Sequence, residues 1–124
     1  MRTDPDKLYQ LTLLADFYGA LLPERQQDVL RMYCEENQSL SEIAEELGVS
    51  RQAVHEALKK GERSLLDFEE KLGLAARFAK QEALLAQTAE QLDGLSKMAG
   101  APEDAVWRDT LKRIRENIVS LEEE

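Results

Sequence analysis

The segment 40–59 constrains the fold of this chain more than any other part of the sequence. Gly48 separates two short stretches in which apolar residues recur every three or four positions, the spacing of amphipathic helices. Ser39 and Glu42 have the spacing of a capping box, which predicts the start of the first helix. Gly48 can adopt the positive φ that ends this helix, and Ser50 can cap the next one. The pattern predicts a helix-turn-helix.

The apolar residues of this segment also stand where a helix-turn-helix requires them. Two helices that cross steeply need a small residue where their backbones approach, and Ala44 suits that position. The residues expected to fill the space between the helices are Ile43, Leu47, Val49, Val54 and Leu58. Two other interpretations stay open: two amphipathic helices without the motif, or a motif that binds protein or is purely structural.

Helices are predicted on both sides of this segment. The chain has 3 prolines and 6 glycines among 124 residues and no blocks of alternating strand-forming residues, so the sequence predicts an all-α fold. The first helix begins at Asp4-Pro5, and Pro23 ends it and opens the second. The polar residues 35–38 are expected to form the next turn, and the helix after Ser50 is expected to extend over 51–72.

Apolar periodicity assigns a buried face to each of these helices. Gly61 is a weak position in the helix over 51–72, since glycine costs roughly 1 kcal/mol there relative to alanine. The residues expected to face the core are Leu8, Leu11, Leu14, Ala15, Tyr18 and Leu21 in the first helix, Val29, Leu30, Tyr33 and Cys34 in the second, and Val54, Leu58, Leu65, Leu66 and Phe68 in the helix over 51–72.

The pattern changes after Gly73, which predicts a second domain over 73–124 following a helix-turn-helix domain over 1–72. Gly94 and residues 100–102 are expected to form a turn between two helices, giving an antiparallel αα-hairpin. Trp107 is interpreted as a core residue or as an anchor for a partner. The expected apolar faces are Leu74, Phe78, Leu85, Leu92 and Leu95 in the first of these helices, and Trp107, Leu111, Ile114, Ile118 and Leu121, with coiled-coil spacing, in the second.

Charge and composition limit the classes of function. The formal net charge is -9, and both predicted domains are acidic, so nucleic acid could be bound only through a local basic patch. The one cysteine, Cys34, and the one histidine, His55, are too few for a disulfide or a Cys/His metal site, and they fit a cytoplasmic protein. The sequence shows no signal peptide, no apolar stretch long enough to span a bilayer and no catalytic motif. We expect no enzyme, no cofactor and no membrane insertion.

The second helix of the motif carries the candidate nucleic-acid site. Its first residues enter the major groove when this motif docks on DNA, where Arg51 could read guanine and Gln52 adenine. From position 50 to 63 the chain has four basic and two acidic side chains, a local excess of positive charge that could contact phosphates. The alternative is an ordinary solvated helix face. The candidate residues are Ser50, Arg51, Gln52, His55, Glu56, Lys59, Lys60 and Arg63.

Two family resemblances follow from these residues. The stretches Leu22 to Leu30 and Ser39 to Val54 resemble region 4 of bacterial sigma factors, the module that reads the promoter −35 element. The whole chain more closely resembles the YlxM-type helix-turn-helix proteins, through Asp16 to Leu22, Ser50 to Val54 and Asp67 to Leu72. This resemblance implies a sigma-region-4-like all-α fold and a link with the signal recognition particle pathway, and it offers no catalytic residues.

The sequence therefore predicts a regulatory helix-turn-helix protein that binds nucleic acid, with DNA ahead of RNA as the ligand. Signal recognition particle components are further candidate partners. One acidic module would bind weakly, so a homodimer that presents two recognition helices is expected, with the C-terminal hairpin supplying the seam. The alternative is a protein–protein adaptor that uses the helix-turn-helix as a scaffold, because an acidic surface suits a basic partner.

Overall fold

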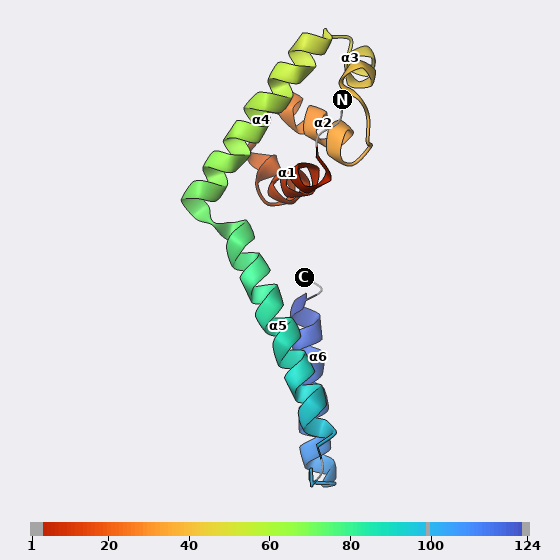
Figure 1. Ribbon diagram of the computed structural model, residues 1–124, viewed down its shortest axis with the longest axis vertical. Helices are drawn as coiled ribbons and strands as arrows, with labels where there is room; N and C mark the ends of the chain where they lie inside the picture. Colours follow the sequence, from red (N-terminus) through yellow and green to blue (C-terminus); the bar gives the residue numbers. More distant parts are fainter. Residues whose placement is uncertain (1–3, 99, 123–124) are drawn as a thin grey trace. The chain divides into compact units, whose positions relative to one another are not determined.

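The computed structural model describes residues 4–98 and 100–122, and these residues are almost entirely helical (Figure 1). Within these ranges the chain forms six α-helices, one short 3-10 helix and no β-strand, which confirms the predicted all-α fold. The elements are α1 (Pro5–Tyr18), η1 (Gly19–Leu21), α2 (Glu24–Cys34), α3 (Leu40–Leu47), α4 (Arg51–Leu72), α5 (Leu74–Ser96) and α6 (Ala105–Glu122).

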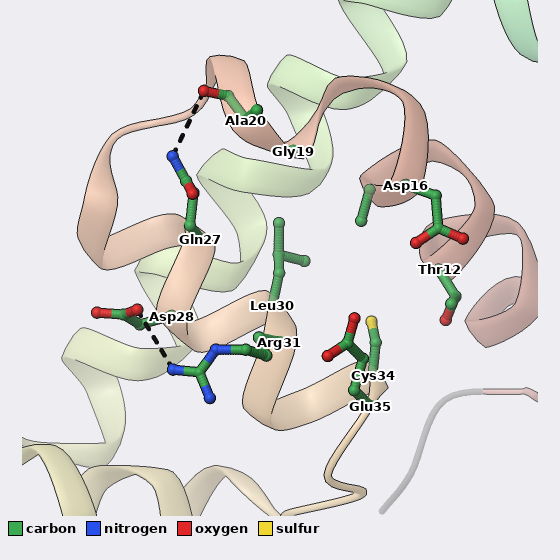
Figure 2. A pocket seen from close by; sticks show the side chains of 11 residues that line it. Thr12, Asp16, Gly19, Ala20, Gln27, Asp28, Leu30, Arg31, Cys34 and Glu35 are labelled. Atoms are coloured by element: carbon green, nitrogen blue, oxygen red, sulfur yellow. Dashed lines mark hydrogen bonds and ion pairs between the residues drawn. The ribbon is translucent and has the colours of Figure 1, made fainter.

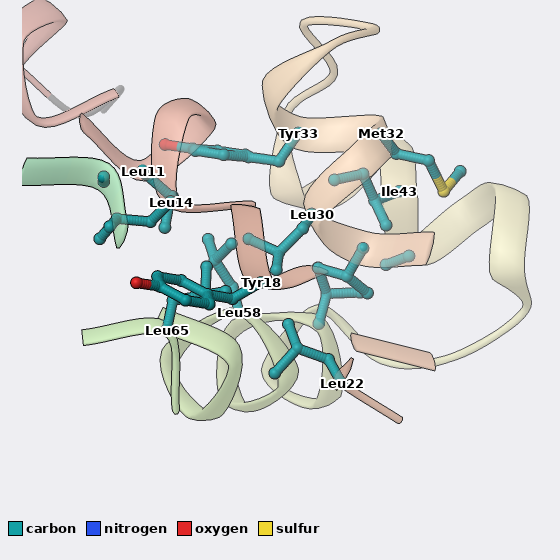
Figure 3. Close-up of a cluster of buried hydrophobic side chains, with 14 residues drawn as sticks. Leu11, Leu14, Tyr18, Leu22, Leu30, Met32, Tyr33, Ile43, Leu58 and Leu65 are labelled. Carbon is teal, nitrogen blue, oxygen red and sulfur yellow. The ribbon is translucent and has the colours of Figure 1, made fainter. Parts of the chain in front are cut away.

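The chain divides into two compact units, residues 1–75 and 76–124. In the first unit, α4 packs against α1, α2 and α3, so that three short helices share one long helix as their common neighbour (Figure 1). Val29, Ile43 and Leu65 lie at the centre of this core and have no exposed surface. Figure 3 shows the core side chains converging from all four helices. The buried residues are Leu11, Leu14, Tyr18, Leu22, Val29, Leu30, Met32, Tyr33, Ile43, Ala44, Val54, Leu58, Leu65 and Ala75.

Gly61 lies where α4 packs against α2. Gly61 is buried, and a Cβ atom placed on it would lie 3.2 Å from Cδ1 of Leu30 and 3.8 Å from Cβ of Gln26. The first distance is shorter than ordinary van der Waals contact, so the Leu30 side chain would have to shift to admit a side chain at this position. The low helix propensity of Gly61 is therefore offset by the packing that its missing side chain allows.

Two core positions predicted for the first unit were wrong. Leu21 is 62% exposed, because the chain tightens into the 3-10 helix η1 after Tyr18 and the next residue, Leu22, takes the buried position. Leu66 is 48% exposed, since the buried stripe of α4 passes through Leu58 and Leu65 and leaves the neighbouring position outside. The error at Leu21 is a shift in helical phase by one residue, whereas at Leu66 the predicted buried stripe is one residue too wide, because Leu65 was correctly predicted to face the core.

The second unit consists of α6 and all of α5 after Ala75, which lie side by side and antiparallel (Figure 1). Arg115 of α6 and Asp93 of α5 form an ion pair with a distance of 2.7 Å between Nε and Oδ1. Asp104 caps α6 by accepting the N–H groups of Val106 and Trp107 at 2.7 and 3.3 Å.

The sequence overestimated how much of this hairpin is buried. Leu95 is 43% exposed, and the predicted coiled-coil seam fails at Ile114 and Leu121, which are 41% and 54% exposed. Gly94 does not form the turn, because α5 continues through it to Ser96. A hairpin gives each helix only one neighbour, which cannot cover an apolar stripe that curves around the helix.

Tyr18 and Glu69 complete the first unit at the junction of α4 and α5. Gly73 ends α4 with a φ of 62° and has no side chain with which to cap α5. The Tyr18 hydroxyl instead accepts the N–H of Leu74 at 3.0 Å and donates to Oε1 of Glu69 at 2.6 Å. The same Glu69 oxygen accepts the N–H of Ala75 at 3.0 Å. Side chains of the first unit thus supply the hydrogen-bond acceptors for the first two N–H groups of α5.

Candidate nucleic-acid interface

The connection between α3 and α4 has the caps that the sequence predicts. The Ser39 hydroxyl accepts the N–H of Glu42 at 3.1 Å, and the Glu42 carboxylate accepts the N–H of Ser39 at 2.9 Å, which confirms the capping box. Gly48 ends α3 in the left-handed conformation with a φ of 69°. Ser50 then caps α4 by accepting the N–H of Ala53 at 3.0 Å. The turn is thus fixed by local hydrogen bonds at both ends.

The predicted site residues fall into two groups on the surface of α4. Arg51, His55 and Lys59 lie along one side of α4 and line a groove. The second group faces away from the core and is exposed; it comprises Gln52, Glu56, Lys60 and Arg63, with Ser50 exposed at the cap. All eight predicted residues therefore reach the surface to some degree, and His55 is the one that is half-buried.

Several of these side chains already have partners within α4. Gln52 donates to the Glu56 carboxylate at 3.4 Å, so its amide must exchange this bond before it can read a base. Lys59 lies 3.7 Å from the carboxylate of Glu62. Within residues 4–98 and 100–122, neither a hydrogen bond nor an ion pair engages the side chains of Arg51, Lys60 or Arg63. These three side chains are the cations available for an external anion.

The groove beside α4 has a volume of about 620 Å³ and brings together helices distant in sequence. Its lining includes the apolar residues Leu11, Leu40 and Leu58, and it also mixes cationic residues with carboxylates. The cations are Lys7, Arg51 and Lys59, and the carboxylates are Asp4 and Glu62. Sequence reasoning missed Lys7 and Ser41, because only the packing of α1 and α3 against α4 places them here. The lining residues are Asp4, Lys7, Leu11, Tyr33, Ser39, Leu40, Ser41, Arg51, His55, Leu58, Lys59 and Glu62.

A second hollow, of about 250 Å³, lies between α1, η1 and α2 and has the opposite electrostatic character (Figure 2). Asp16, Asp28 and Glu35 line it, and its one cationic residue, Arg31, is paired with Asp28 at 3.3 Å. Gln27 closes one end by donating to the carbonyl of Ala20 at 3.5 Å. Carboxylates repel phosphate, so this face of the unit is unsuited to nucleic acid.

Two kinds of feature are absent from the part of the chain that the structure describes, a membrane-spanning helix and a cluster of metal ligands. No helix there combines the length and the apolar character needed to cross a membrane. No group of three or more His, Cys, Asp or Glu side chains in the same residues is placed to hold a metal ion.

The capped α3–turn–α4 unit, packed on α1 and α2, places this chain in the class of helix-turn-helix proteins. Comparison with known protein families makes the assignment specific. The chain belongs to the UPF0122 family, described as "Putative helix-turn-helix protein, YlxM / p13 like", whose model matches residues 5–102. The resemblance to the YlxM-type proteins is thereby confirmed.

Individual members of the family are similar over most of their length. A UPF0122 protein of Desulforamulus reducens is 44% identical over 97 residues, which cover 78% of this chain and 82% of the relative. One from Acetivibrio thermocellus is 39% identical over 118 residues, 95% of this chain and 98% of the relative. A third, from Symbiobacterium thermophilum, is 48% identical over 84 residues, 68% of this chain and 78% of the relative.

Proposed function

We propose that this protein is a regulatory helix-turn-helix protein that binds nucleic acid, DNA in preference to RNA, through the exposed face of α4. The observation that carries the proposal is the set of three cations without partners, Arg51, Lys60 and Arg63, on the second helix of a well-capped helix-turn-helix. In the docking geometry of this motif, the first turn of that helix meets the base edges and later turns approach phosphates. Arg51 would then face bases, and Lys60 and Arg63 would face the backbone.

The groove beside α4 supports the same orientation of the helix-turn-helix on nucleic acid. Lys7 and Arg51 both line it, beside Ser41 at the start of α3. The first helix of the motif crosses the nucleic-acid backbone when the second lies in the major groove of the duplex, so Lys7, close to the start of α3, fits a phosphate while Arg51 faces the bases. Asp4 and Glu62 on the same rim weaken this contact, which makes α4 the main binding surface.

The acidic character of the chain argues for two copies acting together. The net charge of -9 opposes long-range attraction of phosphates, so each module gains little from general electrostatics. A homodimer doubles the local contacts and would present two copies of α4 to neighbouring half-sites. The exposed Ile114 and Leu121 are apolar positions of α6 that a second copy could cover. A role in the signal recognition particle pathway, as the family resemblance implies, is part of the same proposal.

The proposal is tested by fluorescence anisotropy with a labelled random-sequence duplex DNA and a labelled signal recognition particle RNA across a series of salt concentrations. We compare the native chain with Lys60→Ala/Arg63→Ala and with a control of equal charge, Arg25→Ala/Arg31→Ala, whose sites are exposed and lie on α2. Loss of two phosphate contacts should lower the salt slope by about two in the first variant only. The tighter ligand and the number of chains bound per duplex define the target.

A protein–protein adaptor is the second candidate, and the acidic hollow of Figure 2 is the observation that favours it. Asp16, Asp28 and Glu35 there suit a basic segment of a partner protein better than any phosphate. If neither nucleic acid binds at low salt, the nucleic-acid proposal is wrong and the helix-turn-helix is a scaffold for protein recognition.

A further inference from the structure

The most basic stretch of the chain lies outside the helix-turn-helix, in α6. From position 107 to 115 the sequence has four basic side chains and one acidic one, compared with four and two over the longer stretch from 50 to 63. Helix α6 begins at Ala105, beyond the residues 5–102 that the family model matches. The second unit as a whole is acidic, so this stretch is a local excess of positive charge. It lies outside the helix-turn-helix and has no part in the function proposed for that motif.

Three of these cations form a stripe on one face of α6. Arg108, Lys112 and Arg115 are spaced four and three residues apart, so they share a face and follow one another at intervals of about 5 to 6 Å along the helix axis. All three line a shallow depression of about 200 Å³ between α5 and α6. Its other lining residues are Leu92, Asp93, Ser96 and Leu111.

The partners of the three cations differ in a way that suits an anion site. Arg115 is held by Asp93 through its Nε atom at 2.7 Å, which orients the guanidinium and leaves its terminal N–H groups for a further acceptor. Arg108 and Lys112 are exposed, and no hydrogen bond or ion pair engages their side chains within residues 4–98 and 100–122. The neighbouring Arg113 is likewise paired through its Nε atom, with Asp109 at 3.2 Å, but it does not line the depression.

We propose that the stripe Arg108–Lys112–Arg115 is a second phosphate-binding surface, which contacts the backbone of a nucleic-acid strand through consecutive phosphodiester groups. Regular spacing of cations along one helix face matches a ligand with regularly spaced charges, whereas a single small anion would use only one or two of them. This inference rests on the proposed function in one respect, that the ligand is a nucleic acid.

The stripe can be tested separately from α4 in the full-length chain. Arg108→Ala/Lys112→Ala removes the two unpaired cations and keeps the Asp93–Arg115 ion pair. The matched control is Arg77→Ala/Lys80→Ala, which removes the same charge from exposed positions of α5 in the same unit. A charge-conserving variant, Arg108→Lys/Lys112→Arg, tests whether position and charge suffice. Circular dichroism confirms that each variant remains helical.

We expect Arg108→Ala/Lys112→Ala to weaken binding to the labelled duplex or RNA by about tenfold at low salt and to lower the salt slope by about one to two. The control and the charge-conserving variant should bind as the native chain does, to within about twofold. Equal weakening by the stripe variant and the control would reduce the stripe to a general charge effect and overturn the inference.

The comparison with the α4 variant separates this inference from the proposed function. Loss of binding in Lys60→Ala/Arg63→Ala but not in Arg108→Ala/Lys112→Ala overturns the stripe and leaves the helix-turn-helix site standing. The reverse pattern supports the stripe and contradicts the α4 site. Absence of binding by the native chain contradicts both.

Discussion

The two units of this protein are built from similar helices but differ in how fully those helices bury their apolar faces. In the first unit, three helices pack around α4, and Val29, Ile43 and Leu65 are completely enclosed. In the second, Ile118 is the one buried hydrophobic residue among positions 76–98 and 100–122, and it is still 8% exposed. Leu95, Ile114 and Leu121, which belong to the predicted apolar faces, are 43%, 41% and 54% exposed. An amphipathic pattern thus predicts a helix and its apolar side but not the extent of burial, which depends on the number of neighbouring helices.

The largest expected difference between the units is in the cost of deleting a buried side chain. Leu65→Ala should reduce the free energy of unfolding by about 2 to 5 kcal/mol, because the enclosed site cannot collapse around the lost atoms. Ile118→Ala should cost at most about half as much, since water and flexible neighbours can fill the narrow seam of the hairpin. Urea denaturation followed by circular dichroism measures both.

Leu66→Ala is the control for the first unit, because it removes the same atoms one residue further along α4 at a position that is 48% exposed. Its expected cost is below about 1 kcal/mol. If Ile118→Ala were as damaging as Leu65→Ala, the hairpin would be as tightly packed as the first unit, and the contrast between the units would be wrong.

Glycine provides the next comparison, since each unit has one inside a helix. Gly61→Val should destabilise the protein by about 1 to 3 kcal/mol, because the new side chain meets Leu30, at 3.2 Å from its first atom. Gly94→Ala should stabilise it by up to about 1 kcal/mol, because no atom lies within 4 Å of the added methyl group and alanine favours the helix. Thermal denaturation gives both shifts, and a stabilising Gly61→Val would show that α2 and α4 are not closely packed.

The features that sequence predicted correctly are those set by neighbouring residues. The Ser39–Glu42 capping box, the positive φ of Gly48 and the Ser50 cap each involve residues within a few positions of one another, and all three are confirmed. Gly61 was interpreted as a weak position, because its contact with Leu30 requires two helices to be placed together. The errors at Leu21 and Leu66 arise similarly, since the 3-10 turn and the neighbours of α4 decide which leucine is covered.

The candidate site likewise combines features that neighbouring residues determine with features that only tertiary packing determines. The exposed residues of α4 followed from helical periodicity, and their contact with nucleic acid stays a prediction. Lys7 could not be assigned to the groove from sequence, because α1 reaches it only through tertiary packing. The stripe of α6 has a local signal in the sequence, the spacing of Arg108, Lys112 and Arg115. The depression that these residues line, and the ion pair between Arg115 and Asp93 of α5, require the structure.

The smallest predicted effect concerns the end of the first unit, where Tyr18 and Glu69 hold the N–H groups of Leu74 and Ala75. Burial raises the pKa of the Tyr18 hydroxyl above its usual 10.0, and its hydrogen bond to the Glu69 carboxylate raises it further; together these outweigh the opposing effect of the Leu74 N–H. Since the unfolded chain loses this proton first, the stability contributed by the protonated hydroxyl is fully present below about pH 10 and is lost as pH rises through the folded-state pKa.

Tyr18→Phe should therefore lower stability modestly at neutral pH, because the N–H of Leu74 loses its acceptor, and should flatten the loss of stability above pH 10. Urea denaturation at neutral and alkaline pH measures both effects. Tyr9→Phe, at a 70% exposed position of the same helix, is the control and should leave both nearly unchanged. If the native chain and Tyr18→Phe lost stability in parallel above pH 10, the Tyr18–Glu69 hydrogen bond would not stabilise the junction of α4 and α5. The end of the first unit would then be placed at Gly73.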